Sequence, residues 1–292
     1  MTSSPTSTIL RTMMLTVVLT AQLSAQSKSS DHAVSEDGNR MVVSGKWEEA
    51  IVAYRQALER APQSATVHGN LAYAYSQRGR YLEAIDSLKL AISIEPDNAV
   101  FRYNLGNIYL RLNRPVEAIK LLEQAIDRKS DYFQAYNDLG NAHANVGMYR
   151  EAIVALEKAT KLNPSFALAY HNLGVVYYEL ARYKKAVQYF QKAVVIDGNY
   201  TEAHNALGVT YLWLKRYEAA IASLERVLRA DPNDSRAQYH LGIAYVALKN
   251  RDGFSRQYEL LRTLDHELAS LLYSAFYQNR VLILAKNTTI VK

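Results

Sequence analysis

The 292-residue sequence contains no cysteine, so it cannot form a disulfide, supply a thiol nucleophile or bind a metal through thiolates. It also lacks a G-x-x-x-x-G-K phosphate loop, a G-x-G-x-x-G dinucleotide fingerprint and a G-x-S-x-G nucleophile elbow. None of its seven histidines has another histidine four residues away, the spacing that places two zinc ligands on one helix face. We therefore expect a protein without enzymatic activity, a bound metal or a cofactor.

Neither the basic nor the acidic residues form a continuous run in the sequence. The formal net charge is +6, and the lysines and arginines are spread over many predicted helices, several of them near C-terminal helix ends that favour a cation. The aromatic residues mostly fall at packing positions and do not form the stacking platforms of single-strand binders. We expect no nucleic-acid partner.

The apolar run near the N-terminus, residues 13–19, is well short of the ~20 residues that cross a bilayer. It follows Arg11 and precedes small residues that end at Ala25, an arrangement that resembles a secretory signal peptide, which we predict over residues 1–25. Ala21 is an alternative cleavage point, and membrane association would require the segment to stay uncleaved. We expect the mature chain to be secreted or periplasmic, with residues 26–36 as a flexible linker.

What the sequence does contain is a repeat of 34 residues. An alanine recurs at this interval, at Ala50, Ala84, Ala118, Ala152, Ala186 and Ala220. The same interval carries a Leu-Gly or Leu-Ala pair that begins at Leu71, Leu105, Leu139, Leu173, Leu207 and Leu241. Around these markers apolar residues follow helical spacing in two segments, separated by turns that contain Gly, Asn or Pro. Each repeat is therefore predicted to be two amphipathic helices.

The glycine of each Leu-Gly pair lies inside a predicted helix, where it costs up to ~1 kcal/mol relative to alanine. Its recurrence therefore requires a packing reason. We predict that it lies against the recurring small alanine of the second helix, so that the two helices cross closely.

The spacing of Leu-Gly, Tyr, Ala, Leu or Phe, Ala and Pro resembles the tetratricopeptide repeat. The resemblance covers about residues 31–268 and implies an all-α fold, an α-α superhelix (solenoid) of about seven helix-turn-helix units. The predicted units are residues 31–64, 65–98, 99–132, 133–166, 167–200, 201–234 and 235–268, within a solenoid over residues 37–268. The first unit has Asp37-Gly38 in place of Leu-Gly, so its first helix is expected to fray, and the last has Phe254 in the alanine position. Residues 269–292 are predicted to form a C-terminal capping helix and an apolar tail, and the amphipathic stretch expected to cap the stack runs from His266 to Phe276.

In a tetratricopeptide stack, the resemblance implies that the face of each first helix opposite its packing residues lines a concave groove. In this sequence that face is rich in asparagine. An amide both donates and accepts, so a row of amides can bind the backbone of an extended peptide whatever its side chains. The repeat domain of O-linked N-acetylglucosamine transferase has a similar asparagine ladder. The candidate partner-binding residues are Asn70, Asn104, Asn107, Asn137, Asp138, Asn141 and Asn172, together with Tyr103, Tyr178 and Trp213. The alternative is that these amides only solvate the face.

The C-terminal third of the same face is apolar and gathers Val175, Tyr178, Val209, Leu212, Trp213, Ile243 and Val246. These residues either form a hot spot for a partner's side chains or pack against the chain's own C-terminal helix. We expect a scaffold that captures an extended or helical segment of a partner protein or peptide. The alternatives are a structural protein of the cell envelope that self-associates through its terminal repeats and tail, and a glycan binder that uses Tyr103, Tyr178 and Trp213.

Overall fold

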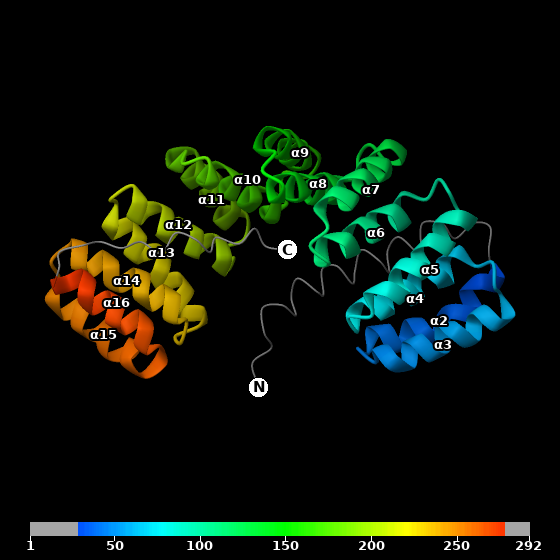
Figure 1. Cartoon of the computed structure of the whole chain (residues 1–292), viewed down its shortest axis with the longest axis horizontal. Coiled ribbons are helices and arrows are strands. Elements are labelled where there is room, and N and C mark those ends of the chain that lie inside the picture. The colour runs from blue at the N-terminus through cyan, green and yellow to red at the C-terminus, as the bar shows by residue number, and fades with distance from the viewer. Residues whose placement is uncertain (1–28, 278–292) are drawn as a thin grey trace. The chain divides into compact units, whose positions relative to one another are not determined.

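The computed structural model describes residues 29–277, and these residues form fifteen α-helices and no strand (Figure 1). The predicted all-α class is confirmed. The helices are α2 (Ser29–Val43), α3 (Trp47–Arg60), α4 (Ala65–Gln77), α5 (Tyr81–Ile94), α6 (Ala99–Arg111), α7 (Pro115–Arg128), α8 (Phe133–Asn145), α9 (Tyr149–Leu162), α10 (Ala167–Glu179), α11 (Tyr183–Ile196), α12 (Thr201–Trp213), α13 (Tyr217–Ala230), α14 (Ser235–Ala247), α15 (Arg251–Leu264) and α16 (His266–Tyr277). The predicted signal peptide and the apolar tail segment, residues 281–285, lie outside the described residues.

A short turn joins the two helices of each repeat. One turn residue has a left-handed backbone conformation, which glycine adopts without steric cost. Three turns use Gly45, Gly79 and Gly147, with φ of 70°, 73° and 79°. The other four place Asn113, Ala181, Lys215 or Lys249 in the same conformation. The backbone N–H after the turn residue closes the helix end, as where Arg80 donates to the Tyr75 carbonyl at 2.9 Å. The turns predicted from the 34-residue spacing therefore coincide with the turns between the paired helices.

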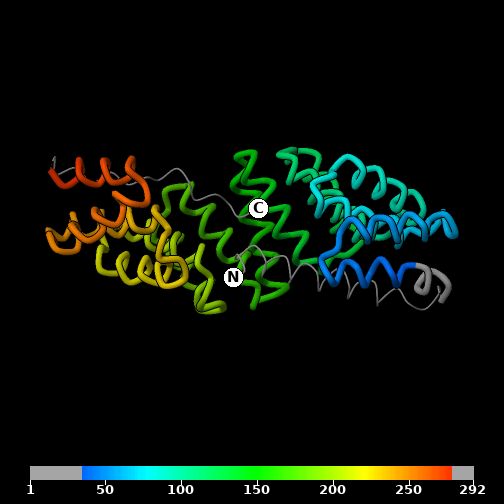
Figure 2. Tube along the Cα trace, turned by 90° about the horizontal axis from the view of Figure 1, so that it is seen from below, coloured from blue at the N-terminus to red at the C-terminus, as the bar shows by residue number. Residues whose placement is uncertain are grey.

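The described helices divide into two compact units: unit 1 contains α2 to α7, before residue 131, and unit 2 contains α8 to α16, after residue 130. In unit 1 the described helices pair as α2 with α3, α4 with α5 and α6 with α7, and successive pairs meet through α3 with α4 and α5 with α6. In unit 2 the pairs are α8 with α9, α10 with α11, α12 with α13 and α14 with α15, and α16 packs on both helices of the last pair. Figure 2 shows the same helix pairs along the Cα trace. Each unit has its own apolar core.

In the repeats from α6 to α13, the glycine of the first helix makes room for a large residue of the second helix. A Cβ atom at Gly174 would lie 2.5 Å from Cδ1 of Phe190, and one at Gly140 would lie 2.5 Å from Cγ of Leu156. The alanine of the second helix is in contact through its backbone, since a Cβ atom at Gly140 would lie 3.0 Å from the Ala152 carbonyl oxygen. The predicted close crossing is therefore present, but the nearest neighbour of the glycine is the Leu or Phe of the second helix rather than the alanine side chain.

The N-terminal end of the repeat array differs from the sequence prediction, and the C-terminal cap overlaps the predicted last repeat. Residues 29–36, assigned to a flexible linker, belong to helix α2, which packs on α3. Gly38 faces the ring of Tyr54 in the way that the later glycines face Leu or Phe. At the other end the capping helix begins at His266, inside the predicted last repeat, and its Leu272 fills the space beside Gly242. Phe254, in the alanine position, stacks on Phe276 of the cap with ring centroids 4.0 Å apart.

Candidate partner-binding site

The first helices of unit 1 carry a row of accessible amides, which we call the amide face and define as Asn39, Asn70, Asn104 and Asn107. Asn70 lies on α4, and Asn104 and Asn107 lie one turn apart on α6. The last three side chains are partly exposed. Within the described residues, neither Asn104 nor Asn107 is engaged in a side-chain hydrogen bond, whereas Asn70 is. Two amides on this face thus keep their full donor and acceptor capacity.

Asn39 of α2 belongs to the amide face although the sequence does not predict it. Its Oδ1 accepts a hydrogen bond from the Tyr54 hydroxyl at 2.7 Å and one from Nδ2 of Asn70 at 3.1 Å. The hydrogen bond between Asn39 and Asn70 joins two successive repeats and fixes the orientation of the Asn70 amide. Asn39 falls two residues beyond Asp37, the residue that replaces the expected leucine, so the imperfect first repeat hides it.

Two tyrosines flank the amide face. Tyr73 packs edge-on against Trp47, with ring centroids 5.9 Å apart. Its hydroxyl is buried and makes no hydrogen bond within residues 29–277. Burial raises the pKa of Tyr73, and the nearby Arg111 guanidinium partly offsets this. Tyr103, the other predicted site tyrosine of unit 1, is partly exposed beside Asn104 in sequence.

The predicted site residues of unit 2 are mostly not accessible. Asn137, Asn141 and Asn172 are 2%, 4% and 1% exposed. Nδ2 of Asn172 donates to Oδ1 of Asn137 at 3.0 Å, which links α10 to α8, and Nδ2 of Asn137 donates to Oδ1 of Asp138 at 3.0 Å. Only Asp138 of this group is partly exposed. The prediction that these three asparagines present their amides to a partner is wrong, because their side chains are buried.

A polar seam, in which all members except Asp138 are buried, consists of Asn137, Asp138, Asn141, His171 and Asn172. Burial lowers the pKa of His171 to about 4, although a hydrogen bond with Asn172 opposes the shift. His171 is therefore neutral near pH 7, and its ring packs between Phe190 and Tyr200, at 5.5 Å and 5.2 Å. The seam serves the packing of successive repeats.

The apolar end of the predicted groove is also largely buried. Val175, Val209 and Ile243 are at most 4% exposed, because they lie in the packed contacts of α10 with α12 and of α12 with α14. Leu212 and Val246 are buried in the same core. The hypothesis of a continuous apolar hot spot is therefore not supported, and these residues join adjacent repeats of unit 2 to one another.

Trp213 is the exception, with 38% of its surface exposed. Its indole N–H donates to the Tyr178 hydroxyl at 2.8 Å, and its ring stacks on Tyr183 with centroids 5.6 Å apart. Burial raises the pKa of Tyr178 to about 12, although the hydrogen bond from Trp213 lowers it. We call Tyr178, Tyr183 and Trp213 the aromatic cluster. Tyr183 begins a second helix, so a search confined to first-helix faces does not find it.

Within residues 29–277, no group of His, Asp and Glu side chains is arranged to hold a metal ion. In the same residues, no helix combines the length and apolar character that crossing a membrane requires.

Family models described as "Tetratricopeptide repeat" match residues 77–142, 182–239 and 211–272, and a further one matches residues 168–195. A model described as "TPR repeat" matches residues 38–79 and 147–181. A search of curated proteins finds no match.

Several solved structures are similar. MamA is 30% identical with a TM-score of 0.51, over 55% of this chain and 94% of MamA. YrrB, described as "a TPR protein with an unusual peptide-binding site", is 26% identical with a TM-score of 0.51, over 64% of this chain and 96% of YrrB. PilF of Pseudomonas aeruginosa is 21% identical with a TM-score of 0.65, over 74% of this chain and 97% of PilF, and at this identity the likeness shows the fold alone.

Proposed function

The chain belongs to the tetratricopeptide repeat family, and from this premise we propose that it is a non-enzymatic scaffold that binds an extended segment of a partner protein on the amide face of unit 1. The observation that carries the proposal is the pair Asn104 and Asn107, whose amides are partly exposed and engaged in no hydrogen bond within the described residues. Because each amide offers both a donor and an acceptor, the pair suits the alternating groups of a peptide backbone.

The repeat spacing supports an extended ligand. Packed helices lie ~8 to 10 Å apart, and an extended chain advances ~3.3 Å per residue. Asn70 and Asn104 occupy the same position in successive repeats. A bound segment would therefore meet an equivalent amide at about every third residue. The likeness to YrrB, with its peptide-binding site, adds support for a peptide ligand.

In unit 2 the exposed Trp213 offers a second kind of contact, an apolar side-chain anchor. Its orientation is held by the hydrogen bond to Tyr178 and the stacking on Tyr183. This role replaces the broad apolar hot spot predicted from the sequence.

The proposal is tested with the full-length chain on an array of unstructured peptides of varied sequence, followed by titration of the peptide that binds best. We expect the Asn104→Ala/Asn107→Ala variant to lose about tenfold or more in affinity, since each lost amide contact is worth ~0.5–1.5 kcal/mol. Asn145→Ala is the matched control, because Asn145 is exposed at the end of α8 and outside the amide face. Equal affinities for both variants would contradict the proposal.

A second candidate function is self-association through the last repeat. It is favoured by Tyr273 and Tyr277 of α16, which are 45% and 65% exposed and lie with ring centroids 4.3 Å apart. Sedimentation of the full-length chain and of its Tyr273→Ser/Tyr277→Ser variant tests it. Oligomers that persist in the variant would count against this surface.

We further propose that the chain is exported and that residues 1–25 are removed. The apolar run behind Arg11 and the small residues up to Ala25 support this proposal. N-terminal sequencing of the protein isolated from its own cells tests it, and an N-terminus at Met1 would contradict it.

A further inference from the structure

Helix α11 has an unusual charge pattern. It carries Lys184, Lys185 and Lys192 and no aspartate or glutamate. In contrast, each of the other second helices of the described repeats has an acidic residue in its first turn. None of the ion pairs found among the described residues involves a lysine of α11. The helix therefore presents uncompensated positive charge.

The exposed residues of α11 form one stripe, which we call the lysine face. It consists of Lys184, Lys185, Gln188, Gln191, Lys192 and Val195, all of them exposed. Their spacing of three or four residues places them on one side of the helix. The stripe ends in an apolar position, since Val195 is 83% exposed and Ile196 beside it is 37% exposed.

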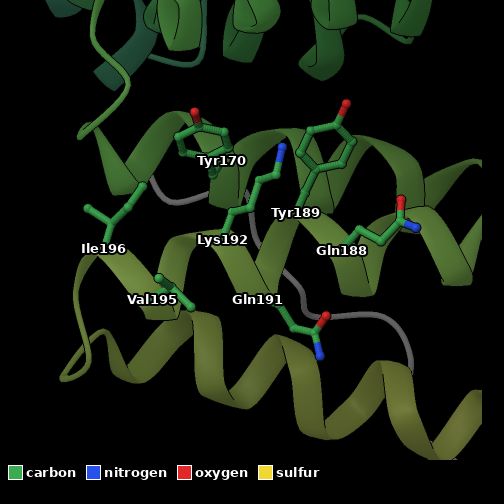
Figure 3. Close-up of a pocket in the computed structure, with 7 residues that line it drawn as sticks. All are labelled: Tyr170, Gln188, Tyr189, Gln191, Lys192, Val195 and Ile196. Carbon is green, nitrogen blue, oxygen red and sulfur yellow. The ribbon is translucent and has the colours of Figure 1, made fainter.

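Tyrosine rings hold the two lysines nearest the centre of this face. Nζ of Lys192 lies 5.6 Å from the ring centroids of both Tyr170 and Tyr189, and Nζ of Lys185 lies 5.1 Å from that of Tyr177. Tyr177 and Tyr189 stack on each other at 5.2 Å and 6°. Figure 3 shows the Lys192 side chain rising between the Tyr170 and Tyr189 rings. Cation–π contacts of this kind restrict the ammonium groups before any ligand arrives.

A depression of about 470 Å³ lies over this region, open to solvent and lined by Tyr170, Gln188, Tyr189, Gln191, Lys192, Val195 and Ile196 (Figure 3). It combines an ammonium group, amides and an apolar margin. Gln191 is already engaged, because its Nε2 donates to the Tyr211 hydroxyl at 2.9 Å, while Gln188 has no such bond within the described residues. The carboxylate of Glu157 on α9 adds to the rise in the pKa of Tyr189. None of the ion pairs found among the described residues joins Glu157 to Lys192.

We propose that the lysine face is a second partner-binding surface, which takes an acidic segment of a protein whose carboxylates meet Lys185 and Lys192 and whose aliphatic side chain covers Val195. Charge complementarity carries the choice of ligand, and the exposed valine adds the apolar contact. The rings beside the lysines argue against a nucleic acid or a glycan, because those ligands stack on free aromatic faces. Here the Tyr177 and Tyr189 rings stack on each other, Lys185 lies over Tyr177, and Lys192 lies over Tyr170 and Tyr189.

The test uses the full-length chain and a short fluorescein-labelled peptide of glutamate and leucine, with binding measured by anisotropy. We expect Lys185→Gln/Lys192→Gln to weaken binding about fivefold, the effect of two exposed ion pairs. We expect Val195→Asp to weaken it about tenfold through lost apolar burial and added repulsion. Since all three side chains are exposed, both variants should keep the helical circular dichroism and melting temperature of the wild type.

Lys158→Gln/Lys161→Gln is the matched control, because these lysines are exposed on the neighbouring second helix α9. An equal loss in this control, equal binding of a glutamine-for-glutamate peptide, or no binding by the wild type would overturn the proposal. The proposal would also be overturned if the wild type bound a labelled oligothymidylate more tightly than the acidic peptide and the Lys185→Gln/Lys192→Gln variant lost that binding. Asn104→Ala/Asn107→Ala should leave this binding unchanged, so failure here and failure of the amide face are separate results.

Discussion

Replacing Gly174 by alanine tests the packing on which the repeat array depends. The new Cβ atom would lie 2.5 Å from both Cδ1 and Cε1 of Phe190. Carbon atoms in contact are normally ~3.5–4.0 Å apart. Phe190 is fully buried in the core of unit 2, so relief of the overlap requires either the packed ring or α10 to shift.

Two effects of opposite sign decide the outcome. Alanine is favoured over glycine inside a helix by ~1 kcal/mol. Overpacking a filled core costs ~1–3 kcal/mol. We therefore expect Gly174→Ala to lower the free energy of unfolding by about 1 kcal/mol, which corresponds to a melting temperature about 2–4 °C lower for a unit of this size. Gly106→Ala should be closer to neutral, since its nearest contact, Cγ of Leu122, is at 3.1 Å.

Thermal unfolding followed by circular dichroism measures the effect. Gly198→Ala is the control in the same unit, because a Cβ atom there would meet only the Val194 carbonyl oxygen at 3.9 Å. It should be neutral or slightly stabilising. If the melting temperature of Gly174→Ala is equal to or higher than those of the wild type and the control, the close contact with Phe190 does not explain the glycine at position 174.

Two further predictions concern the polar seam. The folded-state pKa of His171, about 4, lies below the ordinary value of 6.5, so the unfolded state binds the proton more readily; stability should be full above pH 6.5 and fall by up to roughly 3 kcal/mol towards pH 4. Urea unfolding across this range should show the loss in the wild type and less of it in His171→Gln; the same slope in both would contradict the assignment. Asn172→Ala removes the donor to Asn137 and should cost ~1–3 kcal/mol, in contrast to the exposed Asn145→Ala; unchanged melting of Asn172→Ala would show that the seam hydrogen bond has no structural role.

The sequence predicts the helices well because its markers are local packing requirements. The spacing of Leu173-Gly174 and Ala186 is met by α10, α11 and a turn at Ala181. The same reasoning finds the accessible part of the amide face in unit 1, where Asn104 and Asn107 remain partly exposed.

It fails for Asn137, Asn141 and Asn172 because a helical wheel describes one helix alone. Whether a residue on its free side is exposed depends on how close the next first helix lies, and α8 and α10 are near enough for a direct amide hydrogen bond. Tyr183 is missed for a similar reason, since its stacking on Trp213 joins a second helix to the next repeat. Asparagine at these positions has no sequence signal that separates a ligand contact from a contact between repeats.

The central claim is that the amide face recognises peptide backbone rather than side chains. It is tested most directly by comparing the affinity of a bound peptide with that of the same peptide N-methylated at every third residue. We predict that N-methylation weakens binding to the wild type about tenfold or more and has little effect on the already weakened Asn104→Ala/Asn107→Ala variant. Equal affinity of the wild type for both peptides would contradict the account.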